Sequence, residues 1–72
     1  EKILECFYRN RKKELYFSEI LRETGLTQNT TLKHLRSLQE LGLIIFQKNI
    51  GNTFYKINPK NHLIYAIFSY FD

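Results

Sequence analysis

Only three residues, 25–27, separate two segments that both have helical patterning. In the first segment Ser18 is a good N-cap and is followed by the acidic residue Glu19. Gly25 is expected to end this helix in the left-handed conformation. Thr27 then caps a second helix, which stops at Gly42. A connection this short makes the two helices cross steeply, so these residues predict a helix-turn-helix.

The flanking segments add elements before and after this pair. Apolar residues at helical spacing predict a first helix that ends in the run 10–13, and the β-prone residues 15–17 predict a short strand. The period then changes, and we expect strands over 43–48 and 53–58 joined by a turn over 49–52. The predicted fold class is α+β and mostly helical. It is a winged helix-turn-helix: helix, short strand, helix, turn, recognition helix, β-hairpin wing and C-terminal helix.

Composition narrows the classes of function. The chain has a net charge of +4 and an isoelectric point near 9.4, which favours a polyanionic partner, nucleic acid before an anionic membrane surface. Cys6 is the one cysteine, so no internal disulfide forms, and we expect a buried thiol in a cytoplasmic protein. No run of about twenty apolar residues indicates a membrane span. No nucleophile with a base, carboxylate pair or glycine-rich phosphate loop is present, so we expect neither enzyme activity nor a cofactor.

Four short patterns lie between Phe17 and Ile45: GLT at 25–27, KHL at 33–35, SL at 37–38 and ELGLI at 40–44. With them, this stretch resembles the winged helix-turn-helix of the ArsR and MarR regulators, and archaeal domains look alike here. Such regulators are homodimers whose third helix enters the major groove, while the wing touches the backbone or minor groove. The resemblance therefore implies double-stranded DNA as partner.

The metal-sensing ArsR members carry cysteines near the recognition region or at the chain ends, and this chain has none there. Its two histidines, His34 and His62, do not supply the three or four ligands that a zinc site needs. We therefore expect no metal site, and His34 is assigned to structure or to a phosphate contact.

The second helix of the pair has a core side and an exposed side. At about 100° per residue, Thr31, Leu35 and Leu38 share a core stripe flanked by His34 and Leu41. Opposite lie Asn29, Lys33 and Arg36, an amide and two cations of the kind that pair with base edges. The residues expected to contact DNA from this helix are Thr27, Gln28, Asn29, Thr30, Lys33 and Arg36.

Two alternatives stay open on this helix. The exposed stripe is also compatible with an ordinary solvated face, in which Glu40 pairs with Arg36 four residues away. Leu32 lies between the two sides, so it either packs on the preceding helix or touches a thymine methyl group.

The wing has no arginine at its tip, and minor-groove insertion usually uses arginine. We expect Lys48 and Asn52 to contact phosphates, which position the domain without reading sequence. A flanking basic edge faces either DNA or solvent; its members are Arg9, Arg11, Lys12 and Lys13.

The last segment is apolar almost all round. Asn58 and Pro59 indicate the cap and first residue of a helix from Lys60 to about Tyr70. A helix on one small core needs only one apolar stripe, so the surplus predicts a homodimer or docking against sequence beyond Asp72. The residues assigned to the dimer interface are Ile64, Tyr65, Ile67, Phe68 and Phe71. We divide the chain into a winged helix-turn-helix DNA-binding domain over 1–58 and a C-terminal apolar helix over 59–72.

Together these features predict sequence-specific binding of double-stranded DNA by a transcriptional regulator, with helix 28–41 in the major groove and the wing on the backbone. The alternative is a winged-helix interaction or anchoring module of a larger protein, such as a nucleotidyltransferase-like enzyme. RNA stays open as the nucleic acid, with Phe46 or Phe54 as the aromatic platform. Because the chain begins at Glu1 and ends in an apolar segment, we expect a piece of a longer protein or disordered ends.

Overall fold

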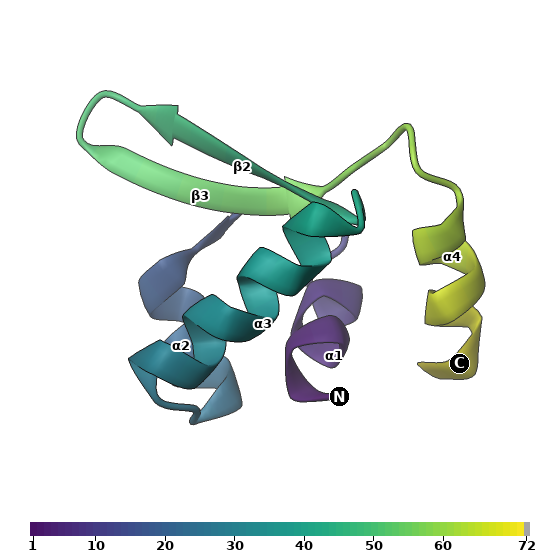
Figure 1. The fold of residues 1–72 in the computed structure, drawn as a ribbon, viewed down its shortest axis with the longest axis horizontal. Coiled ribbons are helices and arrows are strands. Elements are labelled where there is room, and N and C mark those ends of the chain that lie inside the picture. The colour runs from purple at the N-terminus through teal and green to yellow at the C-terminus, as the bar shows by residue number, and fades with distance from the viewer. Residues whose placement is uncertain (72) are drawn as a thin grey trace.

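The computed structural model describes residues 1–71 and has the predicted order of elements (Figure 1). Three helices lie on one side of a small sheet, and the last helix lies at the end of the molecule opposite the hairpin turn. The fold is α+β and mostly helical, as predicted. The predicted C-terminal segment 59–72 is described as far as Phe71.

The first helix, α1, spans Lys2–Arg9. The Glu1 carboxylate accepts hydrogen bonds from the backbone N–H groups of Ile3 at 2.9 Å and Leu4 at 3.1 Å. These bonds satisfy two donors that have no partner within the helix. The helix buries Ile3, Cys6 and Phe7.

Strand β1 is Leu15–Tyr16, and α2, Phe17–Thr24, follows without a break. The prediction that Ser18 caps this helix is wrong, because the cap is Tyr16, whose N–H donates to the Glu19 carboxylate at 3.0 Å. This bond sets the helix start two residues earlier, so Phe17 belongs to α2 and not to the strand. Gly25, at φ 69°, ends α2 in the left-handed conformation as predicted.

Helix α3 spans Gln28–Glu40, and the hydroxyl oxygen of Thr27 caps it by accepting the N–H of Thr30 at 3.2 Å. Its buried residues are the predicted Thr31, Leu35 and Leu38. Leu41 was expected to flank this stripe but is 67% exposed. The helix ends just before it, and Gly42, at φ 74°, turns the chain toward the sheet.

The wing consists of β2, Ile44–Asn49, and β3, Asn52–Ile57. The sheet is antiparallel with strand order β1-β3-β2, so β3 is central. Asn49 pairs with Asn52, and the turn therefore consists of Ile50 and Gly51 alone, two residues shorter than predicted. Gly51 has φ 82°, which a glycine adopts without strain.

The predicted start of the last helix is wrong. The structure has α4 over Leu63–Phe68, followed by a 3-10 turn, η1, over Ser69–Phe71. The side-chain oxygen of Asn58 accepts the N–H of Lys60 at 3.0 Å, as a cap would, but no helix follows directly, and the Asn58 amide donates to the Gly42 carbonyl at 2.9 Å. Residues 58–62 therefore form a connection tied to the end of α3, and the helix begins only after it.

The core lies between the helices and the sheet. It joins α1, α2, α3 and the sheet to α4, through Ile64 and Phe68. The ring of Tyr8 on α1 contacts those of Phe68 and Phe71 at centroid distances of 5.3 and 5.4 Å. Within residues 1–71, no helix has both the length and the apolar character needed to cross a membrane.

Candidate nucleic-acid interface

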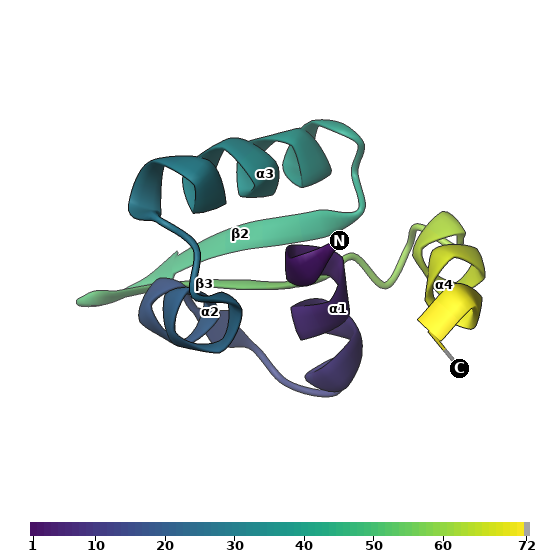
Figure 2. The same cartoon turned by 90° about the horizontal axis from the view of Figure 1, so that it is seen from below.

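Helix α3 lies along one side of the molecule, with α1, α2 and the sheet behind it (Figure 2). The side chains of Thr31 and Leu35 are fully buried against these elements, and Leu38 is 4% exposed. Since the buried stripe faces the body, the opposite side of α3 faces outward. The helix-turn-helix therefore presents one face of α3 to solvent.

The outward stripe consists of Asn29, Lys33 and Arg36, and all three side chains are exposed as predicted. The ion pair between Arg36 and Glu40 that a plain solvated face suggested is absent from the ion pairs of residues 1–71. Neither cation of the stripe is neutralised by an acid of the described chain. The stripe is thus an amide and two unpaired cations, which suits phosphates and base edges.

The N-terminal end of α3 carries the other predicted polar residues. Gln28 is exposed, and the Thr27 hydroxyl donates to the Thr30 hydroxyl oxygen at 3.0 Å. Thr27 therefore acts mainly as the helix cap, and Thr30 keeps its own hydroxyl hydrogen for another acceptor. Leu32 is 39% exposed beside the outward stripe, so part of its surface is open to a thymine methyl group.

Arg36 connects α3 electrostatically to the sheet. Burial raises the pKa of the Tyr55 phenol, and the positive charge of Arg36 acts in the opposite direction. The guanidinium group is therefore close enough to β3 to influence a group on it.

The two predicted contact residues of the wing, Lys48 and Asn52, lie on opposite faces of the hairpin. Because side chains alternate along a strand, Lys48 shares a face with Phe46, whose ring lies 5.0 Å from that of buried Tyr55. Asn52 pairs with Asn49 on the other face, at the tip. Lys48 is therefore the wing cation on the face that carries Tyr55.

Two apolar residues of the wing are exposed. Ile50 at the tip, to which the sequence assigned no role, is fully exposed, and Phe46, one of the two predicted platforms for RNA bases, is 42% exposed. The position of Ile50 between Asn49 and Gly51, in a turn signal, was the available clue.

His34 lies beside the N-terminus of α1, with its Nδ1 atom 3.9 Å from the Glu1 carboxylate. The two roles predicted for His34, a structural one and a phosphate contact, both stay predictions. Among residues 1–71, no three His, Cys, Asp or Glu side chains are grouped so that they could hold a metal ion.

The C-terminal residues predicted for a dimer interface have different environments. Ile64 and Phe68 are in the core of the chain's own fold, with 0% and 4% exposure, so their side chains are not available to a partner. Ile67 and Phe71 pack against that core. Tyr65 is 52% exposed. The large apolar side chains exposed at this end are Leu63, Tyr65 and Tyr70.

Comparisons with known proteins bear on the fold and the family of the chain. No curated protein sequence matches the chain significantly. Among solved structures, the fold is similar to Sso10a-2, a DNA-binding protein from Sulfolobus solfataricus, with a TM-score of 0.74 and 18% identity over 97% of this chain and 74% of that one. At that identity the likeness establishes the winged helix fold alone. Residues 2–45, from α1 to the start of the wing, match the model of the bacterial regulatory protein, arsR family. The chain belongs to the arsR family of bacterial regulatory proteins.

Proposed function

We propose that this domain binds double-stranded DNA in a sequence-specific manner as the DNA-reading part of a transcriptional regulator. The observation that carries the proposal is the outward stripe of α3, in which Lys33 and Arg36 have no acidic partner in the described chain. Family membership and a DNA-binding structural neighbour support it. In the proposed complex α3 enters the major groove, with Asn29 and the two cations at base edges and phosphates.

The wing has a positioning role in this proposal. Lys48, on the face that carries Tyr55, supplies a charge for a phosphate, and Asn52 at the tip supplies an amide. Contacts of this kind fix register on the duplex but carry no sequence information.

The proposed assembly is a cytoplasmic homodimer that pairs through the C-terminal end. Its contact surface is the exposed set of Leu63, Tyr65 and Tyr70, because Ile64 and Phe68 already stabilise the monomer. Two-fold pairing would direct two α3 helices at half-sites about 34–36 Å apart, and so at a pseudo-palindromic site.

The test begins with selection of a preferred duplex from a random pool. The affinities of Lys33→Ala and Arg36→Ala for the selected and a scrambled duplex are then measured by fluorescence anisotropy. We expect each substitution to cost about 1–3 kcal/mol of discrimination while circular dichroism stays unchanged, because both side chains are exposed.

Lys60→Ala is the matched control, since it removes an equal charge from the exposed connection before α4. Wild-type affinity and discrimination in both α3 variants would mean that α3 does not read DNA, and the proposal would fail.

A further inference from the structure

The most basic segment of the chain is not on α3. Residues 9–14, from the last residue of α1 to the residue before β1, hold four cations and one acid, a net charge of +3 against +4 for the whole chain. The four cations are exposed: Arg9, Arg11, Lys12 and Lys13. We call this segment the basic loop.

The four cations of the basic loop differ in whether they have an acidic partner. Lys13 donates to Glu19 at 2.9 Å, and Arg9 forms an ion pair with Glu5 at 3.4 Å, so the charges of these two are partly offset. Arg11 is held in place because its guanidinium group donates to the Tyr8 carbonyl at 2.8 Å and lies 4.5 Å from the centre of the Tyr8 ring. Lys12 has no ion pair among residues 1–71. The loop is thus an ordered surface with at least two cations that no acid neutralises.

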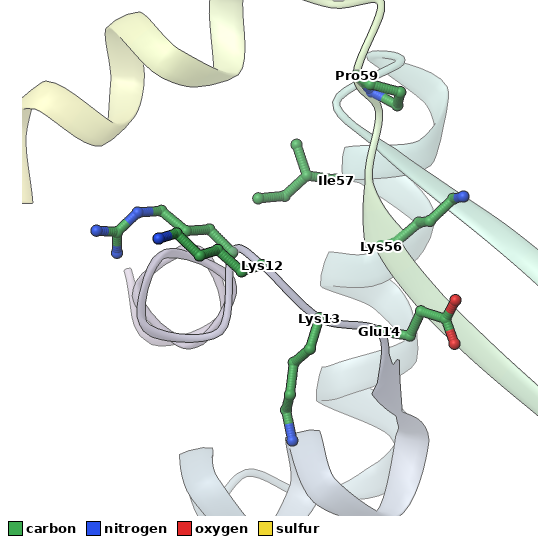
Figure 3. Close-up of a pocket in the computed structure, with 7 residues that line it drawn as sticks. Lys12, Lys13, Glu14, Lys56, Ile57 and Pro59 are labelled. Atoms are coloured by element: carbon green, nitrogen blue, oxygen red, sulfur yellow. The ribbon is translucent and has the colours of Figure 1, made fainter.

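The shape beside the loop argues against a small anion as its ligand. A hollow lies between the loop, the end of β3 and the connection to α4, and Figure 3 shows Ile57 pointing into it. In the same view Lys13 and Lys56 point away from the hollow and away from each other. A pocket for one small anion needs donors that converge, whereas cations that diverge over a surface match the spaced charges of an extended polyanion.

The basic loop and α3 face opposite directions. Figure 2 shows α3 along one side of the molecule and the loop between α1 and β1 on the other. This direction is the shortest axis, along which the Cα atoms span 21 Å (Figure 1). Duplex DNA is stiff over about 150 base pairs, so one duplex does not fold back around so thin a body to touch both faces.

We propose that the basic loop is a second DNA-binding surface, which holds the backbone of another duplex while α3 holds the first. The domain then bridges two duplexes, a function beyond reading one site. This inference rests on the proposed function only for the identity of the first surface. The second surface contacts phosphates and has no sequence preference.

The experiment uses a biotinylated duplex on streptavidin beads and a fluorescent duplex of the same sequence in solution. We expect wild-type protein to retain the fluorescent duplex on the beads, with retention lost as salt rises. Lys12→Glu, which alters no ion pair of the described chain, loses this retention but keeps wild-type affinity for a single duplex in anisotropy. Lys2→Glu makes the same change in charge on α1 and keeps retention.

Each other outcome overturns the inference. Wild-type retention by Lys12→Glu would assign bridging to another surface, such as the two α3 helices of a dimer. Equal loss of single-duplex affinity in Lys12→Glu and Lys33→Ala would mean that both faces contact one duplex. If the basic loop were needed to retain single-stranded RNA but not duplex DNA, its ligand would be RNA and not a second duplex. Failure of the proposed function is separate, because it shows as unchanged single-duplex binding in the α3 variants.

Discussion

The carboxylate of Glu23 joins α2 to α1 through two hydrogen bonds. The Cys6 thiol donates to one of its oxygens at 2.9 Å, and the side-chain amide of Asn10 donates to the same oxygen at 2.9 Å. The bond from Cys6 is the main reason that the pKa of Glu23 is lowered. The pKa of Glu19 is lowered too, chiefly by the N–H of Tyr16. Both ends of α2 therefore depend on an ionised carboxylate.

This dependence predicts acid sensitivity. A carboxyl group with a lowered pKa in the folded state stabilises the fold above its ordinary pKa of 4.5, and this stability is lost as the pH falls through the lowered value. We expect Glu23→Gln to flatten the decline of the unfolding free energy below pH 4.5, measured by urea unfolding at several pH values. Glu40→Gln is the control and keeps the wild-type decline. A Glu23→Gln protein with the wild-type pH profile would contradict the assignment.

Residues differ in how far the sequence predicts their environment. The buried and outward sides of α3 follow from the helical repeat, because Thr31, Leu35 and Leu38 lie within one local period. The bond between Cys6 and Glu23 spans 17 positions, and no local pattern indicates it. The cap of α2 is not predictable from Ser18 alone. The Glu19 carboxylate accepts the N–H of Tyr16, three residues earlier, and this bond makes Tyr16 the cap instead of Ser18.

At the scale of elements, the wing and α3 divide the proposed work between positioning and reading. We expect Lys48→Ala to weaken binding to all duplexes by the same factor, because a lost phosphate contact carries no sequence preference. The slope of log affinity against log salt concentration falls by about one unit. Anisotropy titrations over a salt series measure it, with Gln47→Ala on the neighbouring position as control. A changed sequence preference with an unchanged slope would assign reading to the wing.

The elements themselves were predictable where their signals are local. Gly25 and Thr27 set the bounds of the turn between α2 and α3 from their own capping chemistry, and both bounds are confirmed. The start of α4 was not predictable in this way. Asn58 and Asn61 both donate to the Gly42 carbonyl at 2.9 Å, so a tertiary contact with the end of α3 overrides the local preference for a helix at Pro59.

At the scale of the whole molecule, the exposed apolar side chains of α4 and η1 bear on assembly. We expect the chain to dimerise at concentrations on the order of tens of micromolar. Tyr65→Glu should be monomeric, because Tyr65 is 52% exposed and a buried charge at an interface is costly. Sedimentation velocity measures both, with Gln39→Glu as a control of equal charge. A monomeric wild type would remove the dimer from the proposed function and leave the fold and α3 unaffected.

The buried thiol of Cys6 has a further consequence for studying motion. Burial and Glu23 raise the pKa of this thiol to about 12, and its side chain has no exposed surface. A thiol reagent in water therefore reaches Cys6 only when α1 separates from α2. In the opened molecule the thiol is no longer buried against Glu23, so its pKa returns to the ordinary value. The labelling rate then reports the population of opened molecules without any denaturant. A ligand that binds only the closed form slows this labelling by the same factor by which it stabilises the fold.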